Sequence, residues 1–296
     1  YFHKKIYMQG LSHILNIREK YEHISNLQDV DYKIFSQNGE DGIIDYLLNK
    51  IKIEKPKFVE VGVGNYLESN TRFIFERTSA SGLIIDCMNG LEKEVKNNLK
   101  VWKGELFIHE EMIESKSLNN ILSKYNFSEN TDLFSLDIDG LDYWVIKNLP
   151  KNFSKIVVLE YNSVFGDKLE VTIPEIKMFD RKKYHHSHLC YGSSLKAIIS
   201  LMKNKNFYFV GSNLLRNNAF FVSNDFPKEK YFPNLKVYDL EYHTNCNVSE
   251  SRDEKGKLNF LKGSDKLKSI LDCEVVDVSD TSYKQNKLRH FIEKLD

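Results

Sequence analysis

The order of apolar segments predicts a doubly wound α/β fold for this chain of 296 residues. Between positions 57 and 161, short apolar runs alternate with amphipathic stretches, which is typical of strands and helices that follow in turn. The runs 83–87 (LIIDC) and 156–161 (IVVLEY) are apolar on both faces, as expected of parallel strands covered by helices on both sides. Two later strand-like runs have no helix between them, which indicates an antiparallel hairpin.

We therefore expect a mostly parallel sheet of seven strands, with helices on both faces and a C-terminal antiparallel hairpin. The parallel strands are predicted over 57–62, 82–87, 105–109, 133–138 and 155–161. Their connecting helices are predicted over 69–78, 91–99, 118–125 and 143–148. A helix over 194–203 then leads into the two hairpin runs, 206–211 and 219–223.

The two flanks of this α/β region read differently from its centre. Residues 1–50 are predicted as an N-terminal helical segment, because apolar residues recur there at helical spacing. The polar stretch 36–42 interrupts it, and Ser36 or Asn38 could cap the helix that follows. Residues 51–225 form the expected main domain, and 226–296 a C-terminal appendage or an arm for homo-oligomer formation. Within that appendage we expect helices over 264–271 and 284–295 and a strand over 274–278.

Composition excludes several classes of protein. Lys+Arg and Asp+Glu both number 42, so the zero net charge gives no reason to expect a nucleic-acid partner. No apolar run reaches the roughly 20 residues that span a bilayer, so we expect no membrane span. Scattered cysteines without a C-x-x-C pair indicate reduced thiols in a cytoplasmic protein rather than a zinc site. These cysteines are Cys87, Cys190, Cys246 and Cys273.

A candidate ligand site lies where the first predicted strand ends. Glu60 precedes Gly62 and Gly64, and glycine lets a backbone turn tightly and approach a ligand closely. An acidic side chain here suits a ligand that carries an ammonium group. Leu67 stands where the dinucleotide pattern G-x-G-x-x-G has its third glycine, so that pattern is incomplete. The alternative is that both glycines only make a tight turn.

Asp86 ends the second predicted strand and strengthens this interpretation. An acidic residue about 20 positions beyond such glycines accepts hydrogen bonds from both hydroxyls of a ribose. A surface aspartate that merely closes a strand is the alternative.

These segments resemble a known family. VEVGVGNYLESNT, which starts at Val59, is similar to motif I of the class I methyltransferases, and LIIDC is similar to their motif II. FSQNGEDGII, LFSLDIDGLDYWV, CYGSSLKAII and NAFFV resemble the FkbM-like group, and the likeness spans roughly 33–225. The resemblance implies a Rossmann-like fold, S-adenosylmethionine as cofactor and O-methylation, often of sugars. Tyr66 departs from the third glycine of that family's turn.

The resemblance also implies a set of cofactor-binding residues. It adds Gln37 and Asp41, which would reach over the cofactor, although Asp41 could instead complement a helix N-terminus. The full predicted set is Gln37, Asp41, Glu60, Gly62, Gly64, Asn65, Asp86 and Asp137.

Two further strand ends predict the acceptor side of the site. Asp137 and Asp139 follow the fourth strand, and Glu160 and Asn162 follow the fifth. Asp137, Glu160 and Asn162 offer hard oxygen ligands that suit Mg²⁺, which would lower the pKa of an acceptor hydroxyl. Without a metal, Asp139 or a histidine would act as general base.

The loop at 181–188 carries the candidate histidine. His186 lies beside His185 and His188, and histidine is a common base near neutral pH. A solvated surface loop is the alternative. The predicted catalytic residues are thus Asp137, Asp139 and His186.

The leading interpretation is a cytoplasmic methyltransferase that acts on a hydroxyl of a small molecule, a sugar or a glycan precursor, in polysaccharide biosynthesis. A second is an NAD-dependent sugar oxidoreductase or epimerase, for which Tyr143 and Lys147 have the required Tyr-x-x-x-Lys spacing. A third is a non-catalytic binding module on the same fold.

Overall fold

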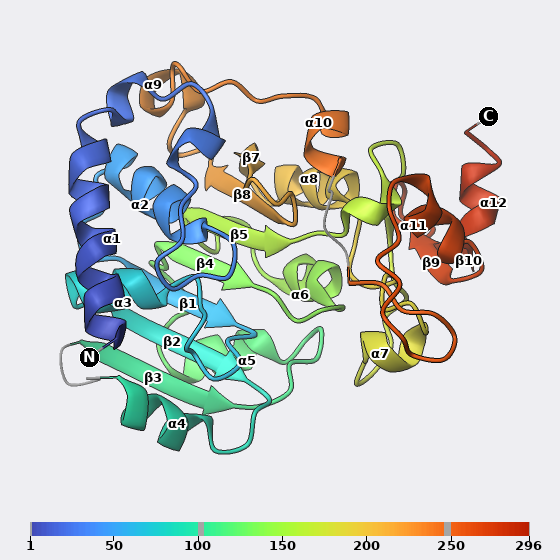
Figure 1. Cartoon of the computed structure of the whole chain (residues 1–296), viewed down its shortest axis with the longest axis horizontal. Coiled ribbons are helices and arrows are strands. Elements are labelled where there is room, and N and C mark those ends of the chain that lie inside the picture. The colour runs from blue at the N-terminus through green and yellow to red at the C-terminus, as the bar shows by residue number, and fades with distance from the viewer. Residues whose placement is uncertain (1, 100–103, 246–249, 296) are drawn as a thin grey trace.

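The computed structural model describes residues 2–99, 104–245 and 250–295, and its centre is one seven-stranded sheet (Figure 1). Its strands are β1 (Lys57–Val61), β2 (Ser81–Asp86), β3 (Glu105–Glu110), β4 (Leu133–Leu136), β5 (Ile156–Glu160), β7 (Phe207–Ser212) and β8 (Asn218–Ser223). They lie in the order β3-β2-β1-β4-β5-β8-β7. The first five pair in parallel, whereas β8 runs antiparallel to both β5 and β7. The predicted Rossmann-like fold with its terminal hairpin is confirmed.

Helices cover both faces of this sheet because strand side chains alternate between them. One buried cluster joins Phe58, Val158 and Phe220 to helices on the first face. These helices are α1 (Phe2–Arg18), α2 (Glu40–Lys50), α3 (Arg72–Thr78) and α4 (Leu91–Asn98). The other cluster joins Val59 and Leu159 to helices on the opposite face. Those are α5 (Leu118–Lys124), α6 (Asp142–Asn148) and α8 (Leu195–Asn204).

The C-terminal part of the chain builds a second, smaller sheet. Its strands are β6 (Val171–Thr172), β9 (Glu274–Asp277) and β10 (Lys284–Lys287), paired antiparallel in the order β10-β9-β6. Together with α11 (Ser264–Ser269) and α12 (Leu288–Ile292), it lies on the side toward which the arrows of β1 to β5 point (Figure 1). Its buried Val275 and Leu288 belong to the same apolar cluster as the second face of the main sheet.

Short elements complete the described chain. They are η1 (Tyr21–His23), η2 (Leu27–Val30), η4 (Ser163–Phe165), α7 (Arg181–Tyr184), α9 (Lys228–Tyr231) and α10 (Leu240–Thr244). Among the helices that the structure describes, none is long and apolar enough to cross a membrane.

Two sequence-based expectations are corrected here. The helix expected over 284–295 is a strand followed by a helix, because 284–287 pairs with β9 although all four of its side chains are exposed. The helix expected from Ser69 begins at Arg72, because the three residues before it bind a buried carboxylate. Cys87, Cys190 and Cys273 are free thiols, as expected, and Cys246 lies outside the described residues.

A buried charge cluster fastens the N-terminal helix to the main domain. Asp45 of α2 is fully buried and accepts two hydrogen bonds from Arg18 of α1, at 3.0 and 2.6 Å. The Tyr21 hydroxyl donates a third at 2.9 Å, and Arg77 of α3 forms a second ion pair with the same carboxylate. One carboxylate thus holds three helices together.

Asp45→Ala should lower the free energy of unfolding by about 3 kcal/mol, because it strands two guanidinium groups in a partly buried place. Urea unfolding followed by circular dichroism measures this. Glu92→Ala, which removes the exposed pair with Lys96, is the matched control and should change stability by no more than about 0.5 kcal/mol. Equal effects of the two substitutions would contradict a structural role for the cluster.

Candidate functional site

A cavity of about 910 Å³ opens at the carboxyl ends of the parallel strands. Its walls include the ends of β1, β2 and β4, the loop after β3, the segment 33–37, and Met178 with Phe179. β1 lies between β2 and β4, so the chain leaves the sheet in opposite directions on the two sides of the cavity. Open α/β sheets bind their ligands at such a position.

The turn after β1 contains two glycines, and only at one of them do neighbouring atoms leave no room for a side chain. Gly62 has a φ of +86°, and a Cβ there would lie 1.6 Å from the carbonyl oxygen of Asp137. Gly64 has a φ of +53°, but a Cβ there would have no described heavy atom within 4 Å. Gly62 therefore packs β1 against β4, whereas Gly64 keeps backbone exposed to the cavity.

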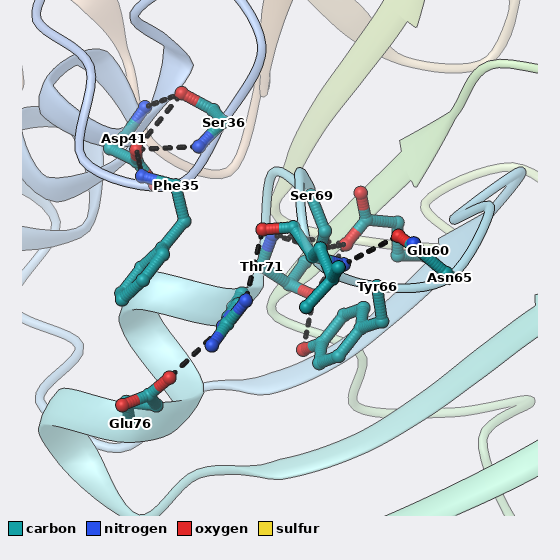
Figure 2. A network of polar contacts seen from close by, with 11 residues as sticks. Phe35, Ser36, Asp41, Glu60, Asn65, Tyr66, Ser69, Thr71 and Glu76 are labelled. Atoms are coloured by element: carbon teal, nitrogen blue, oxygen red, sulfur yellow. Dashed lines mark hydrogen bonds and ion pairs between the residues drawn. The ribbon is translucent and has the colours of Figure 1, made fainter. Parts of the chain in front are cut away.

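Glu60 was expected to face a ligand, but its carboxylate accepts hydrogen bonds mainly from residues of its own chain (Figure 2). Its Oε2 accepts hydrogen bonds from the Ser69 hydroxyl at 2.6 Å and from the Thr71 hydroxyl and amide at 2.5 and 3.0 Å. Its Oε1 accepts one, from the Asn70 amide at 2.8 Å. Burial raises the pKa of Glu60, whereas these hydrogen bonds lower it. The amides before α3 thus bind Glu60 instead of facing the crevice.

Tyr66 shows how the turn tolerates its missing third glycine. Its φ of 61° is in the left-handed region, which is the conformation that a glycine would adopt at no cost. The ring is fully buried in the apolar cluster of the first face, and the hydroxyl lies 3.0 Å from that of Thr71. Burial of the Tyr66 ring therefore offsets the cost of a left-handed backbone conformation that glycine would adopt freely.

Asp86 is tied directly to the glycine turn. Its Oδ2 accepts a hydrogen bond from the Gly64 amide at 2.7 Å, and its Oδ1 accepts one from the Met88 amide at 2.9 Å. Asn65, also in the lining, accepts a hydrogen bond from the Leu67 amide at 3.0 Å. Two strand ends are therefore joined where the cavity begins.

The segment before α2 lines the cavity, whereas Asp41 only holds the backbone of that segment in place. Asp41 is fully buried, and its Oδ2 accepts hydrogen bonds from the amides of Ile34, Phe35 and Ser36 and from the Ser36 hydroxyl (Figure 2). Burial raises its pKa to about 7. Asp41 thus shapes the loop that lines the cavity and does not itself reach the cavity, in contrast to the expectation. Gln37 is exposed and does line it.

The acceptor side holds a cluster of carboxyl groups. Oxygens of Asp137, Asp139 and Glu160 all lie within 4.8 Å of one another. Burial, and then the charges of Asp139 and Asp142, raise the pKa of Asp137 to about 8, although a hydrogen bond with Glu160 opposes this shift. Burial and the Asp137 charge also raise the pKa of Glu160. Both shifts favour a proton held between Asp137 and Glu160.

Arg181 supplies positive charge to this cluster. Its guanidinium group forms an ion pair with Asp139 and stacks over the ring of Tyr191, 4.8 Å from the ring centroid. No sequence pattern identifies Arg181 as a partner of these acids.

Two predicted site residues lie elsewhere. The Asn162 amide donates hydrogen bonds to the carbonyls of Leu189 and Tyr191, and its oxygen accepts one from the Val164 amide. The third oxygen ligand beside Asp137 and Glu160 is therefore Asp139, whereas Asn162 was expected in that position. His186 is exposed, packs against His185 with ring centroids 4.2 Å apart, and lies outside the described lining, which argues against a role as base.

Several other residues that line the cavity were not predicted from the sequence. Ile138, Leu141 and Phe179 form an apolar wall, and Met178 is 67% exposed. Asn218 at the start of β8 also lines the cavity. Apolar residues in loops give no pattern that separates ligand contact from packing.

The Tyr-x-x-x-Lys pair lies away from the cavity. Tyr143 is buried in the apolar cluster of the second face. Lys147 lies over the rings of Trp144 and Tyr283, at 4.8 and 3.9 Å from their centroids. Neither residue belongs to the described lining, so the pair expected of a sugar oxidoreductase is absent from it.

No protein-family model matches this sequence, and no curated protein matches it. Among solved structures, an S-adenosylmethionine-dependent methyltransferase from Clostridium acetobutylicum has 12% identity and a TM-score of 0.40, covering 73% of this chain and 98% of its own. PKMT2 from Rickettsia typhi, in complex with AdoHcy, has 8% identity and a TM-score of 0.38, covering 61% and 52%. Human N-acetylserotonin methyltransferase, in complex with SAM, has 11% identity and a TM-score of 0.32, and the match covers 56% of this chain and 46% of that protein. This chain thus spans about half the length of the last two.

Gly62→Ala should destabilise the protein by more than about 3 kcal/mol, because a left-handed φ and a contact with the Asp137 carbonyl both oppose the new methyl group. Gly64→Ala meets only the unfavourable φ and should cost about 1 kcal/mol. Thermal unfolding of the two variants tests the difference. A Gly62→Ala protein as stable as the Gly64→Ala protein would contradict the close contact of β1 with β4.

Proposed function

We propose that this chain is an S-adenosylmethionine-dependent methyltransferase. The observation that carries the proposal is the use of Glu60 to bind the amides before α3, at 2.8 and 3.0 Å. In dinucleotide-binding folds, the free amides at this helix N-terminus hold a pyrophosphate. Here a carboxylate already occupies them, and its negative charge would repel a phosphate. A cofactor with an adenosyl group and a cationic sulfonium centre suits the same cavity better.

Other lining residues are suited to the separate parts of this cofactor. Asp86, fixed by the Gly64 amide, would accept hydrogen bonds from the ribose hydroxyls, because each carboxylate oxygen can accept more than one. Met112 and Ile113 beyond β3 offer an apolar surface to the adenine ring. The turn at Gly64 leaves backbone open to the sulfonium end, and Gln37 also lines the cavity.

We infer that the acceptor is a hydroxyl group of a sugar or glycan precursor, in keeping with the resemblance to the FkbM-like group. Transfer forms a bond from the acceptor oxygen to the methyl carbon and breaks the carbon–sulfur bond. The acceptor proton must leave, and Asp137 lies in the cavity to accept it. Burial raises its pKa to about 8, so its deprotonated form, which becomes more abundant as the pH rises, is a stronger base than an ordinary aspartate. The apolar wall at Phe179 would exclude water.

A divalent cation is a second candidate for activating the acceptor. The three carboxyl groups of Asp137, Asp139 and Glu160 would hold Mg²⁺, and their oxygens lie close enough together to share one ion. Such an ion would lower the pKa of a bound hydroxyl. Arg181 already offsets the charge of Asp139, so the cluster is also compatible with catalysis by the carboxyl groups alone.

Calorimetric titration should detect binding of S-adenosylhomocysteine and none of NAD⁺. Asp86→Ala should weaken S-adenosylhomocysteine binding at least tenfold, because hydrogen bonds to a charged group contribute about 1.5–3 kcal/mol each. Glu110→Ala is the matched control: Glu110 is the register partner of Asp86 on β3 but lies outside the described lining. Binding of NAD⁺ alone would overturn the proposed function.

Raising the pH should strengthen the binding of Mn²⁺, used as a probe for Mg²⁺. With a pKa of about 8, Asp137 is mostly protonated at pH 7, and the proton competes with the metal. Loss of this competition predicts an affinity gain of about fivefold between pH 7 and 8 and about twofold more before the affinity levels off above about pH 9. Electron paramagnetic resonance of free Mn²⁺ measures it. Full transfer of methyl groups to sugar acceptors in EDTA would eliminate the metal and leave Asp137 as the base.

A further inference from the structure

Lys33 is the only lysine or arginine among the described residues that line the cavity. Seven aspartate and glutamate residues share that lining. S-adenosylmethionine carries a carboxylate at its methionyl end, and nearby acidic side chains would repel it. Within the described lining, Lys33 alone offers this carboxylate a positive charge.

Lys33 already forms an ion pair that a ligand can reach. Its Nζ lies 3.3 Å from Oε1 of Glu68, which also lines the cavity. The two side chains are 49% and 60% exposed. An exposed ion pair contributes little to stability, so a ligand can take over both partners at small cost. The pair thus presents an accessible cation and an accessible anion side by side.

The backbone beside each partner is held in place. Asp41 accepts hydrogen bonds from the amides of 34–36, directly after Lys33. Glu60 accepts hydrogen bonds from the residues directly after Glu68 (Figure 2). Binding of a ligand between the two partners therefore requires only movement of two exposed side chains.

The pair lies where the methionyl end of the cofactor is expected. In the strand order β3-β2-β1, the proposed adenine surface at Met112 and Ile113 follows β3, and the proposed ribose partner Asp86 ends β2. The methionyl chain leaves the sulfur on the side away from the ribose. Its charged end therefore reaches the turn after β1, and that turn carries Glu68.

We propose that Lys33 and Glu68 bind the amino-acid end of the cofactor, Lys33 through the carboxylate and Glu68 through the ammonium group. The proposal rests on the proposed methyltransferase function. Both groups of an amino acid are attached to one carbon atom, so their spacing is comparable to the 3.3 Å between Lys33 and Glu68. The two ion pairs can thus bind head to tail, and each charge exchanges one partner of opposite sign for another.

5′-Methylthioadenosine tests this assignment, because it keeps the adenosine and the sulfur of S-adenosylhomocysteine but lacks the amino-acid end. Neither compound has a net charge at neutral pH, so the overall field of the cavity affects both alike. Calorimetry should show that the wild-type protein binds S-adenosylhomocysteine about tenfold more tightly than 5′-methylthioadenosine. Lys33→Met should weaken S-adenosylhomocysteine binding about fivefold and change the Kd for 5′-methylthioadenosine by less than about twofold.

Three further variants separate local contact from general charge. Lys33→Arg keeps the cation and should retain the wild-type preference within about twofold. Glu68→Gln should lower the preference, because an amide does not neutralise the ammonium group. Lys177→Met is the matched control: Lys177 is exposed and pairs at 3.0 Å with the lining residue Glu114, but lies outside the described lining itself. It should leave the preference at the wild-type value.

An unchanged preference in Lys33→Met, or an equal loss in Lys177→Met, would overturn the role of Lys33 while leaving the proposed function intact. A higher preference in Glu68→Gln would show that Glu68 only competes for Lys33 and would overturn its contact with the ammonium group. Equal binding of the two compounds by the wild-type protein would overturn the whole assignment. Failure of the wild-type protein to bind S-adenosylhomocysteine would instead overturn the proposed function, and this inference with it.

Discussion

The carboxylate of Glu60 joins the end of β1 to the segment that starts α3, and the candidate site depends on that junction. It accepts four hydrogen bonds from Ser69, Asn70 and Thr71 within a buried environment. Hydrogen bonds to a charged group are worth more than neutral ones, and here they offset part of the cost of burying the charge. The fixed segment in turn forms one wall of the cavity. The same interaction removes the free amides that would bind a phosphate.

Strand register places the remaining polar groups on one face of the sheet, in two adjacent rows. Glu60 pairs with Ser135 across β1 and β4, and Glu160 pairs with Asn218 across β5 and β8. Because side chains alternate along a strand, these residues and Asp137 point to the face that α2 and α3 cover. A one-residue slip of any strand would send its polar side chain into the apolar cluster on the opposite face. Burial of that cluster therefore fixes the geometry of the site.

The polar groups on this face differ in character from β1 to β8. At Glu60 the carboxylate is satisfied by its own chain, so it contributes shape and charge. At Asp137 and Glu160 two acids lie too close and too deeply buried for both to ionise readily, which raises both pKa values. Arg181 and Asn218 flank them with positive charge and with a neutral acceptor. Each part of the cavity thus favours a different part of its ligands.

The sequence alone determined the alternation of strands and helices, the terminal hairpin, the glycine turn and the placement of Asp86 and Asp137 at strand ends. These follow from periodicity and from the meeting of parallel strand ends at one edge. Only the tertiary structure decided which partners the polar groups take. Asn162 binds two loop carbonyls, His186 lies in solvent, and Glu40 orients Asn218 from 178 positions away. No local pattern encodes such pairings, because they depend on segments that meet only when the core forms.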